Sequence, residues 1–268
     1  MSLRKRFRTA IVLLAILFVV IQWSPPLVYF LFLQAVIIIS LLEFYGLAGK
    51  KKLQPRSAVG IFIALLIGAS FYFRVVPFEL ALFIGLLCAG VYFLVAFNTI
   101  EKVMSFPASF AITILGPIYV AWTMNYFHPL RQERGPYFIY FLLSVIFLGD
   151  SGAFLFGRLW GKHKMTPIAS PNKTWEGSAG GILFACIGAV AVRFLFLKQI
   201  GLGEALLCGA LVHAIAQVSD PLESLFKRAV GLKDSSNLLP GHGGFLDRID
   251  SLLLATPFFY FFIRYFWK

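Results

Sequence analysis

Charged residues and cysteines are scarce in this sequence. Only 13% of its 268 residues are charged and 59% are hydrophobic, whereas soluble domains carry about 25% charged residues. An ordinary soluble protein is therefore excluded. The three cysteines lie in apolar stretches without a CxxC pair, which excludes a disulfide framework and a His/Cys zinc site. The sequence also lacks a Walker A motif, which excludes a P-loop nucleotide site, and an internal repeat typical of two-halved transporters.

Long apolar runs account for the hydrophobic composition. A helix that crosses a bilayer needs roughly 17–25 apolar residues, and this criterion predicts nine spans at 9–23, 27–48, 57–73, 78–97, 107–127, 137–157, 178–198, 202–222 and 251–267. The predicted fold class is all-α, a polytopic transmembrane helical bundle of about nine spans. We expect one integral membrane unit with an N-terminal scaffold, residues 1–136, and a C-terminal catalytic region, residues 137–268.

The basic residues predict the orientation of the chain. Its net charge of +12 lies in short clusters between apolar runs, a distribution typical of membrane loops and not of a nucleic-acid-binding surface. With a cytoplasmic N-terminus, 17 of the 24 basic residues fall on the cytoplasmic side, as the positive-inside rule requires. Because no small-x-small cleavage site precedes Pro25, the first run is expected to be an uncleaved span. The loops 158–177 and 223–250 then face the cytoplasm, where nucleotides are found.

The acidic residues concentrate in the second half of the chain. Eight of the twelve lie between positions 150 and 250, namely Asp150, Glu176, Glu204, Asp220, Glu223, Asp234, Asp247 and Asp250. Asp150 interrupts a long uncharged run, where an acidic side chain costs up to about 2.5–3.5 kcal/mol. It is either a structural residue that faces the bundle or reaches the interface, or a polar group of the site.

A second polar cluster runs from Ser170 to Gly177 and includes Lys173, Thr174 and Glu176. Its lysine and hydroxyl groups could contact phosphate oxygens. The structural alternative is a helix start with Ser170 before a proline at the first helical position.

The third cluster, from Asp220 to Asp250, is the richest in functional groups. If the chain is helical there, Asp220, Glu223 and Lys227 share one face, as do Asp247 and Asp250. Carboxylates of this kind suit Mg²⁺ together with substrate phosphates, and Gly241, Gly243 and Gly244 would let backbone amides approach an anion. The alternatives are structural: Asp220 as a helix cap before a proline, the basic residues as positive-inside charges, and His242 as part of a turn.

The stretch from Ser224 to Asp250 resembles the signature of phosphatidate cytidylyltransferases, also called CDP-diacylglycerol synthases. The matching residues are Ser224, Phe226, Lys227, Arg228, Lys233, Asp234, Ser236, Leu239, Pro240, His242, Gly243, Gly244, Asp247, Arg248 and Asp250. Gly149 with Asp150 and the segment from Ser170 to Gly177 are also similar to the family. One departure is Ser219, which stands before Asp220 where the family usually has glycine.

This resemblance implies that CTP and phosphatidic acid give CDP-diacylglycerol and pyrophosphate. Asp220 and Asp247 would hold the catalytic metals, Mg²⁺ and in some members K⁺, with Asp250 and Glu223 as nearby support. The remaining expected roles are neutralisation of phosphate charge by Lys173, Lys227, Arg228 and Arg248, substrate binding by Ser170, Thr174, Lys233, His242, Gly243 and Gly244, and support from Asp150, Glu176 and Asp234.

Two other functions compete with this interpretation. A CTP-dependent lipid kinase of the dolichol or phytol kinase type would use a similar site but release CDP, and a lipid transporter would place its charges near the bilayer midplane. A CDP-alcohol phosphotransferase is disfavoured because its Asp-Gly-x-x-Ala-Arg pattern is absent. We expect a multi-pass protein of a bacterial inner membrane with its site at the cytoplasmic face and no nucleic-acid partner; a homodimer is left open.

Overall fold

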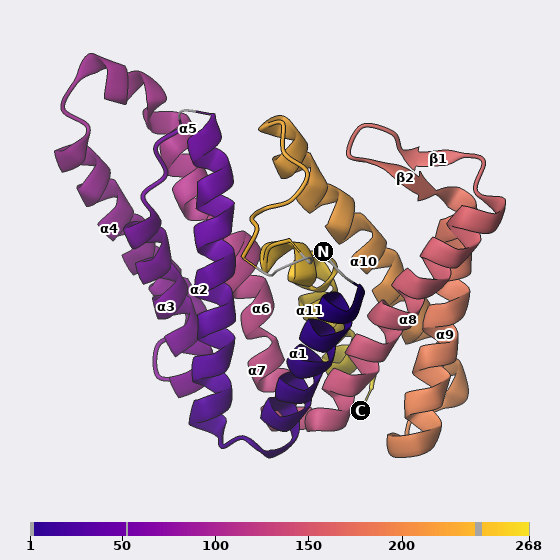
Figure 1. Ribbon diagram of the computed structural model, residues 1–268. Helices are drawn as coiled ribbons and strands as arrows, with labels where there is room; N and C mark the ends of the chain where they lie inside the picture. Colours follow the sequence, from indigo (N-terminus) through magenta and orange to yellow (C-terminus); the bar gives the residue numbers. More distant parts are fainter. Residues whose placement is uncertain (1–2, 52, 239–242, 268) are drawn as a thin grey trace. The chain divides into compact units, whose positions relative to one another are not determined.

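The computed structural model describes residues 3–51, 53–238 and 243–267. This part of the chain is almost entirely helical (Figure 1). Its first half contains α1 (Leu3–Trp23), α2 (Pro26–Lys50), α3 (Ser57–Phe73), α4 (Phe78–Ala96), α5 (Ile100–Gly116), η1 (Pro117–Trp122), α6 (Thr123–Asn125), α7 (Phe127–Pro129) and η2 (Leu130–Arg134). The second half contains α8 (Pro136–Trp160), β1 (Lys164–Thr166), β2 (Ser170–Thr174), α9 (Trp175–Phe196), α10 (Leu202–Ala229) and α11 (Leu246–Phe266).

The all-α membrane fold is confirmed. Within the described residues, seven helical segments are long and apolar enough to cross a membrane, and two shorter apolar helices cover 14–23 and 57–73. Each of the nine predicted spans overlaps one of these helices. The total of nine crossings stays a prediction.

Two details differ from the sequence-based expectation. The predicted loop 223–250 is helical up to residue 229, because α10 continues past the end of its apolar stretch. The predicted loop 158–177 contains an antiparallel hairpin in which Lys164 pairs with Thr174 and Thr166 with Ser170. Hydropathy marks where a chain leaves the apolar layer, and this point need not coincide with the end of a helix.

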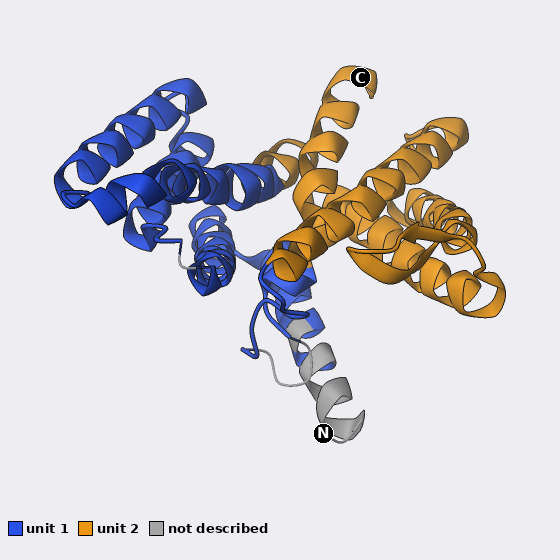
Figure 2. Cartoon of the chain, turned by 90° about the horizontal axis from the view of Figure 1, so that it is seen from above, with its two compact units in different colours: residues 1–128, 230–248 blue, residues 129–229, 249–268 orange. Residues whose placement is uncertain are grey.

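The chain forms two compact units (Figure 2). Unit 1 comprises residues 1–128 and 230–248, and unit 2 comprises residues 129–229 and 249–268. The segment 230–248, which the sequence-based division groups with the C-terminal region, therefore belongs to the unit that contains the N-terminal helices.

Helices of unit 1 pack through apolar contacts and a few buried polar ones. Ile63, Ile67 and Ala89 are fully buried between α3 and α4. The Tyr45 hydroxyl on α2 donates a hydrogen bond to the carbonyl oxygen of Thr113 at 2.8 Å, on α5. A buried Tyr hydroxyl usually has such a partner, and this bond links α2 to α5.

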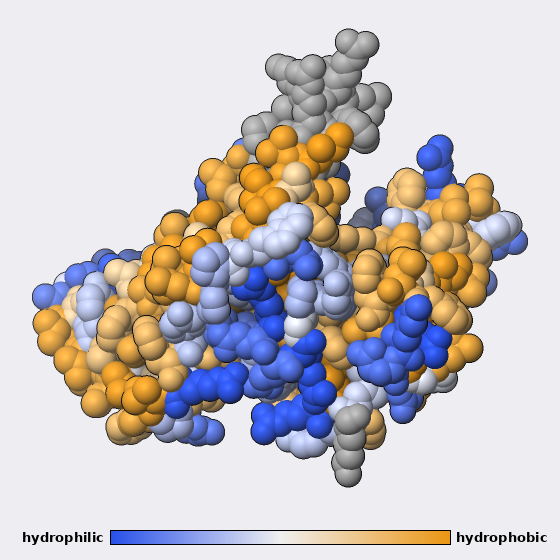
Figure 3. All heavy atoms as spheres, turned by 90° about the horizontal axis from the view of Figure 1, so that it is seen from below, coloured by the Kyte–Doolittle hydropathy of each residue, from blue (hydrophilic) through white to orange (hydrophobic). Residues whose placement is uncertain are grey.

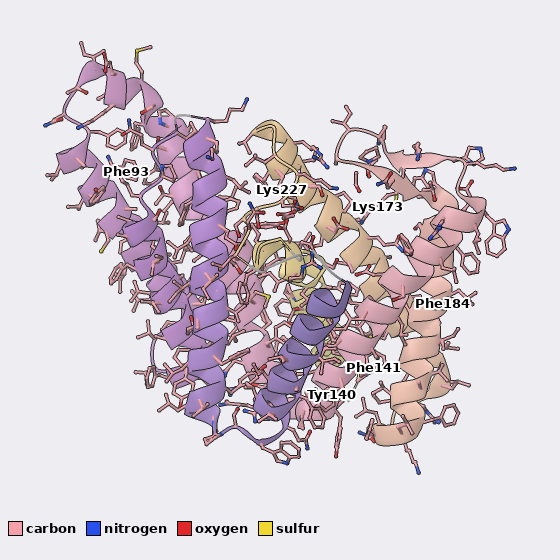
Figure 4. All side chains as sticks on the ribbon, viewed as in Figure 1. Phe93, Tyr140, Phe141, Lys173, Phe184 and Lys227 are labelled. Atoms are coloured by element: carbon pink, nitrogen blue, oxygen red, sulfur yellow. The ribbon has the colours of Figure 1, made fainter. Side chains whose placement is uncertain are left out.

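In unit 2, glycines allow α8 and α9 to pack closely. A Cβ atom at Gly180 would lie 2.3 Å from the ring of Phe156, and one at Gly152 would lie 2.6 Å from Phe184. Phe184 lies on α9 and is labelled in Figure 4. Small residues at such positions let helix backbones approach, which is a common way for membrane helices to associate. Unit 2 also buries Phe141 against Phe259 in a stacked pair with ring centroids 5.4 Å apart.

Many large hydrophobic side chains lie on the surface. They include Leu94 on α4 and Phe154 on α8, and Figure 3 shows hydrophobic residues over much of the face that it draws. Exposed apolar surface of this extent marks an interaction surface in a soluble protein, whereas helices that contact lipid require it.

Candidate active site

Unit 2 carries a row of ionisable side chains along one stretch of α10. Asp220, Glu223 and Lys227 are spaced by three and four residues within this helix. They therefore share one face, as predicted for a helical chain. Glu223 forms an ion pair with Lys227 in which the side chains are only 1% and 8% exposed. Asp220 and Pro221 lie inside the helix and not at its start. The interpretation of Asp220 as a helix cap is therefore wrong.

The hairpin supplies a second lysine to this region. The Lys173 ammonium on β2 lies 2.8 Å from a carboxylate oxygen of Asp220 on α10 (Figure 4). Both side chains are about a quarter exposed, so this pair remains in contact with solvent. The Arg228 guanidinium donates to the carbonyl oxygen of Ala169 at 3.3 Å, which joins the end of α10 to the hairpin.

Two further aspartates of unit 2 interact with the same group. Asp250 on α11 interacts electrostatically with Asp220, Glu223 and Lys227, and Asp150 on α8 interacts with Lys173 and Asp220. Four acidic side chains and two lysines from three helices and one strand thus form a single electrostatic group. The two lysine charges offset part of the repulsion among the four acidic groups.

Ser219 connects α10 to α11 beside this group. Its hydroxyl donates to the carbonyl oxygen of Asp250 and accepts from the amide of Leu254 at 3.3 Å. The residue that departs from the usual family pattern therefore makes two contacts that a glycine could not make. The substitution is compatible with the position of Asp220.

Thr174 and Glu176 organise the hairpin and the start of α9. The Thr174 hydroxyl accepts from the Gly177 amide at 3.1 Å and caps the helix. The predicted cap at Ser170 is wrong, because residues 170–174 are extended and the helix begins four residues later than that cap would require. The Glu176 carboxylate accepts from the amides of Lys162 and His163. Phosphate binding by Ser170 and Thr174 stays a prediction.

Residues 230–238 and 243–248 are the described part of the signature that lies in unit 1, and we call them the signature segment. Several of them make hydrogen bonds to Asp247, at the start of α11. The Asp247 carboxylate accepts from the Ser235 amide at 2.9 Å, from the Ser235 hydroxyl at 3.0 Å and from the Gly244 amide at 2.8 Å. Gly243 has a φ of 79°, a backbone conformation that favours glycine. Asp234, Lys233 and Arg248 are exposed, and His242 lies outside the described residues.

The structure thus brings together most of the predicted site residues within two groups. Asp220, Glu223, Asp250, Asp150, Lys173 and Lys227 form the group in unit 2. Asp247 and the two glycines lie in unit 1. The predicted metal pair of Asp220 with Asp247 combines a residue from each unit and stays a prediction.

A family model described as "Cytidylyltransferase family" matches residues 4–266. The chain belongs to this family. A phosphatidate cytidylyltransferase of Staphylococcus haemolyticus and one of Staphylococcus epidermidis are each 40% identical to the chain over 147 residues, and one of Staphylococcus aureus is 38% identical over 149 residues. Each match covers 55% of this chain and 56% of the relative, so the chain spans about half the length of the curated relatives it matches.

Sequence analysis missed Glu43. This side chain on α2 is 8% exposed and accepts four hydrogen bonds from the signature segment. A signal was available, because Glu43 is the only acidic residue among the first 78 and an ionisable group inside an apolar span is a candidate for function.

His213 on α10 is a second buried polar residue that the sequence analysis did not consider. It is fully buried, and a Cβ atom at Gly149 or Gly181 would lie within 2.5 Å of its ring. Among the described residues its two ring nitrogens have no hydrogen-bond partner. The two glycines therefore make room for the imidazole between α8 and α9.

Proposed function

We propose that the chain transfers a cytidylyl group from CTP to phosphatidic acid and produces CDP-diacylglycerol and pyrophosphate. A phosphate oxygen of the lipid forms a bond to the α-phosphorus of CTP, and the bond from that phosphorus to the bridging oxygen of the β-phosphate breaks. The electron pair of the broken bond leaves with pyrophosphate. A covalent enzyme intermediate is unnecessary, because the lipid phosphate is itself the nucleophile.

The observation that carries the proposal is the group of carboxylates and lysines in unit 2. Both reactants are anions, and a site for them needs positive charge where their phosphates meet. Lys173 is about a quarter exposed and within 2.8 Å of Asp220, so its ammonium is accessible to a phosphate and is oriented by the carboxylate. We assign neutralisation of the phosphates to Lys173, Lys227, Arg228 and Arg248, and further substrate contacts to Lys233, His242 and the two glycines.

The donor atoms of the site suit a magnesium ion. Within the described part of the chain, no three His, Cys, Asp or Glu side chains converge to hold a metal by themselves. Mg²⁺ usually binds through one or two carboxylates completed by water and substrate phosphates, and the partly exposed Asp220 offers an oxygen of this kind. We assign Mg²⁺ to Asp220 and Asp247, with Glu223 and Asp250 in support and K⁺ as an additional ion. When bound, the metal would neutralise charge on the triphosphate.

We place the site at the cytoplasmic face of a bacterial inner membrane. The basic clusters that flank the site residues support this orientation through the positive-inside rule, and bacterial relatives support the source of the membrane. CTP would enter from the cytoplasm and phosphatidic acid from the adjacent leaflet.

The test is incubation of the purified chain with labelled CTP, Mg²⁺ and phosphatidic acid vesicles. A lipid-soluble cytidine product with an equal amount of pyrophosphate is the expected result. Release of CDP with a phosphorylated lipid would instead identify a lipid kinase, and lipid movement without nucleotide consumption would identify a transporter.

The Asp220→Asn variant tests the assignment of the site. It keeps the size of the side chain and removes its charge, and we expect turnover to fall by about 10²-fold or more, as for loss of one electrostatic group in an active site. The matched control is Glu204→Gln, at the other end of α10, where the exposed Glu204 accepts a hydrogen bond from the Gly201 amide at 3.1 Å. Normal turnover of Asp220→Asn would refute the assignment.

A further inference from the structure

Glu43 is a carboxylate in an unusual environment. It lies on α2, a helix of otherwise mostly apolar residues, and its side chain is 8% exposed. A buried carboxylate is unfavourable unless hydrogen bonds or opposite charges compensate for the loss of water. The contacts of Glu43 therefore indicate why the chain keeps an acid at this position.

The signature segment supplies four hydrogen-bond donors to Glu43. One carboxylate oxygen accepts from the Ser236 hydroxyl at 2.6 Å and the Phe245 amide at 3.1 Å. The other accepts from the Ser235 hydroxyl at 2.9 Å and the Leu246 amide at 2.8 Å. A carboxylate has about four lone-pair sites, so Glu43 can accept from all four donors, although it shares the Ser235 hydroxyl with Asp247.

Two of these donors fix the start of α11. The first amides of a helix lack partners within the helix, and the helix dipole favours a negative charge beside them. Glu43 binds the amides of Phe245 and Leu246, directly before Asp247. A carboxylate 203 residues earlier in the sequence thus acts as the cap of the helix that carries the proposed metal ligand.

Ser235 couples Glu43 to Asp247 directly. Its hydroxyl oxygen lies 2.9 Å from a carboxylate oxygen of Glu43 and 3.0 Å from one of Asp247. A hydroxyl has a single proton to donate, so the two carboxylates compete for it and a change at one alters the hydrogen bonding of the other.

The packing around these groups leaves no space for a larger residue at position 244. A Cβ atom at Gly244 would lie 2.0 Å from the Ser235 hydroxyl oxygen and 2.4 Å from a Glu43 carboxylate oxygen. The glycine of the signature is therefore needed here so that Glu43 and Ser235 can reach the backbone.

We infer that Glu43 is a positioning residue for Asp247: it holds the signature segment and the start of α11 in the conformation that the transfer reaction requires. This inference rests on the proposed function in so far as Asp247 serves that reaction. Glu43 itself acts through the helix start and through Ser235, and it makes no contact with the reactants in this assignment.

The test compares Glu43→Gln with Glu79→Gln in the full-length chain. Glutamine preserves the shape of Glu43 but directs an NH₂ group at donors that need an acceptor. Hydrogen bonds to charged groups contribute about 1.5–3 kcal/mol, so the Phe245 and Leu246 amides should exchange hydrogen for deuterium about 10–100-fold faster. The Mg²⁺ concentration for half-maximal activity should rise by about 10–100-fold, the usual effect of losing a group that orients a metal ligand. Glu79 is an exposed acid on α4, and its variant should change neither quantity.

Ser236→Ala provides a milder variant in case Glu43→Gln does not fold. It removes one neutral donor to Glu43, and we expect both quantities to change in the same direction by about threefold to tenfold, in line with a single hydrogen bond of about 0.5–1.5 kcal/mol. Unchanged exchange, or faster exchange with an unchanged Mg²⁺ requirement, would overturn the inference. A wild-type chain that does not turn over CTP would instead refute the proposed function, and the exchange measurement would still decide whether Glu43 holds the segment.

Discussion

Replacing Lys227 with methionine should destabilise the protein strongly, because it removes the ammonium that pairs with Glu223 in a nearly dry environment. The two side chains are 8% and 1% exposed, and Asp250 interacts electrostatically with both of them. Removal of one partner from a buried ion pair typically costs about 3–5 kcal/mol. For a chain of this size, 1 kcal/mol corresponds to roughly 2–4 °C in Tm, so the expected loss is about 6–20 °C.

The assay is thermal unfolding of the purified protein in detergent, with one scan rate for all variants. The matched control is Lys173→Met, which breaks the pair with Asp220. Its side chains are 24% and 29% exposed, and exposed pairs contribute about 0–1 kcal/mol. The double variant Glu223→Gln with Lys227→Met should recover most of the loss, because neutralising both partners leaves neither of them as an unpaired buried charge. Equal losses for the two lysine variants, or no recovery in the double variant, would refute the argument.

Two further predictions concern α9. Thr174→Ala removes the hydroxyl that accepts from the Gly177 amide and should lower the free energy of unfolding by about 1 kcal/mol, whereas Thr174→Ser should keep most of it; chemical denaturation compares the two. Gly180→Ala places a methyl group 2.3 Å from the ring of Phe156 and should lower Tm, with partial rescue by Phe156→Ala. Gly203→Ala, where the added methyl group meets no atom within 4 Å, should leave Tm unchanged.

Sequence patterns predicted the spans because hydropathy is a local property. Each of the nine predicted ranges overlaps a helix, and the shared face of Asp220, Glu223 and Lys227 follows from helical spacing alone. The family was also predictable, since the short stretch from Ser224 to Asp250 matches the family signature at many positions.

Local signals misplaced two helix starts for a physical reason. Ser170 and Asp220 each precede a proline, a pattern that favours the first turn of a helix. At Ser170 the pairing with the opposite strand instead keeps the backbone extended. At Asp220 a long helix continues through the buried Pro221, although the proline removes one backbone hydrogen bond.

The role of Glu43 could not be deduced from local patterns. Its partners Ser235 and Ser236 lie 192 and 193 residues away in the sequence, and only the folded backbone brings them together. Hydropathy could have indicated that an acid at this position is unusual, but not which donors would satisfy it.

The hydrogen bonds of Glu43 also make the C-terminal half of the chain depend on the N-terminal half. A fragment starting at residue 137 would contain the entire family signature, yet its two serine hydroxyls and two helix-start amides would lack the acceptor that α2 provides. The presence of the motif in such a fragment would therefore not show that the fragment is active. A separately expressed N-terminal fragment that contains α2 would supply the missing acceptor.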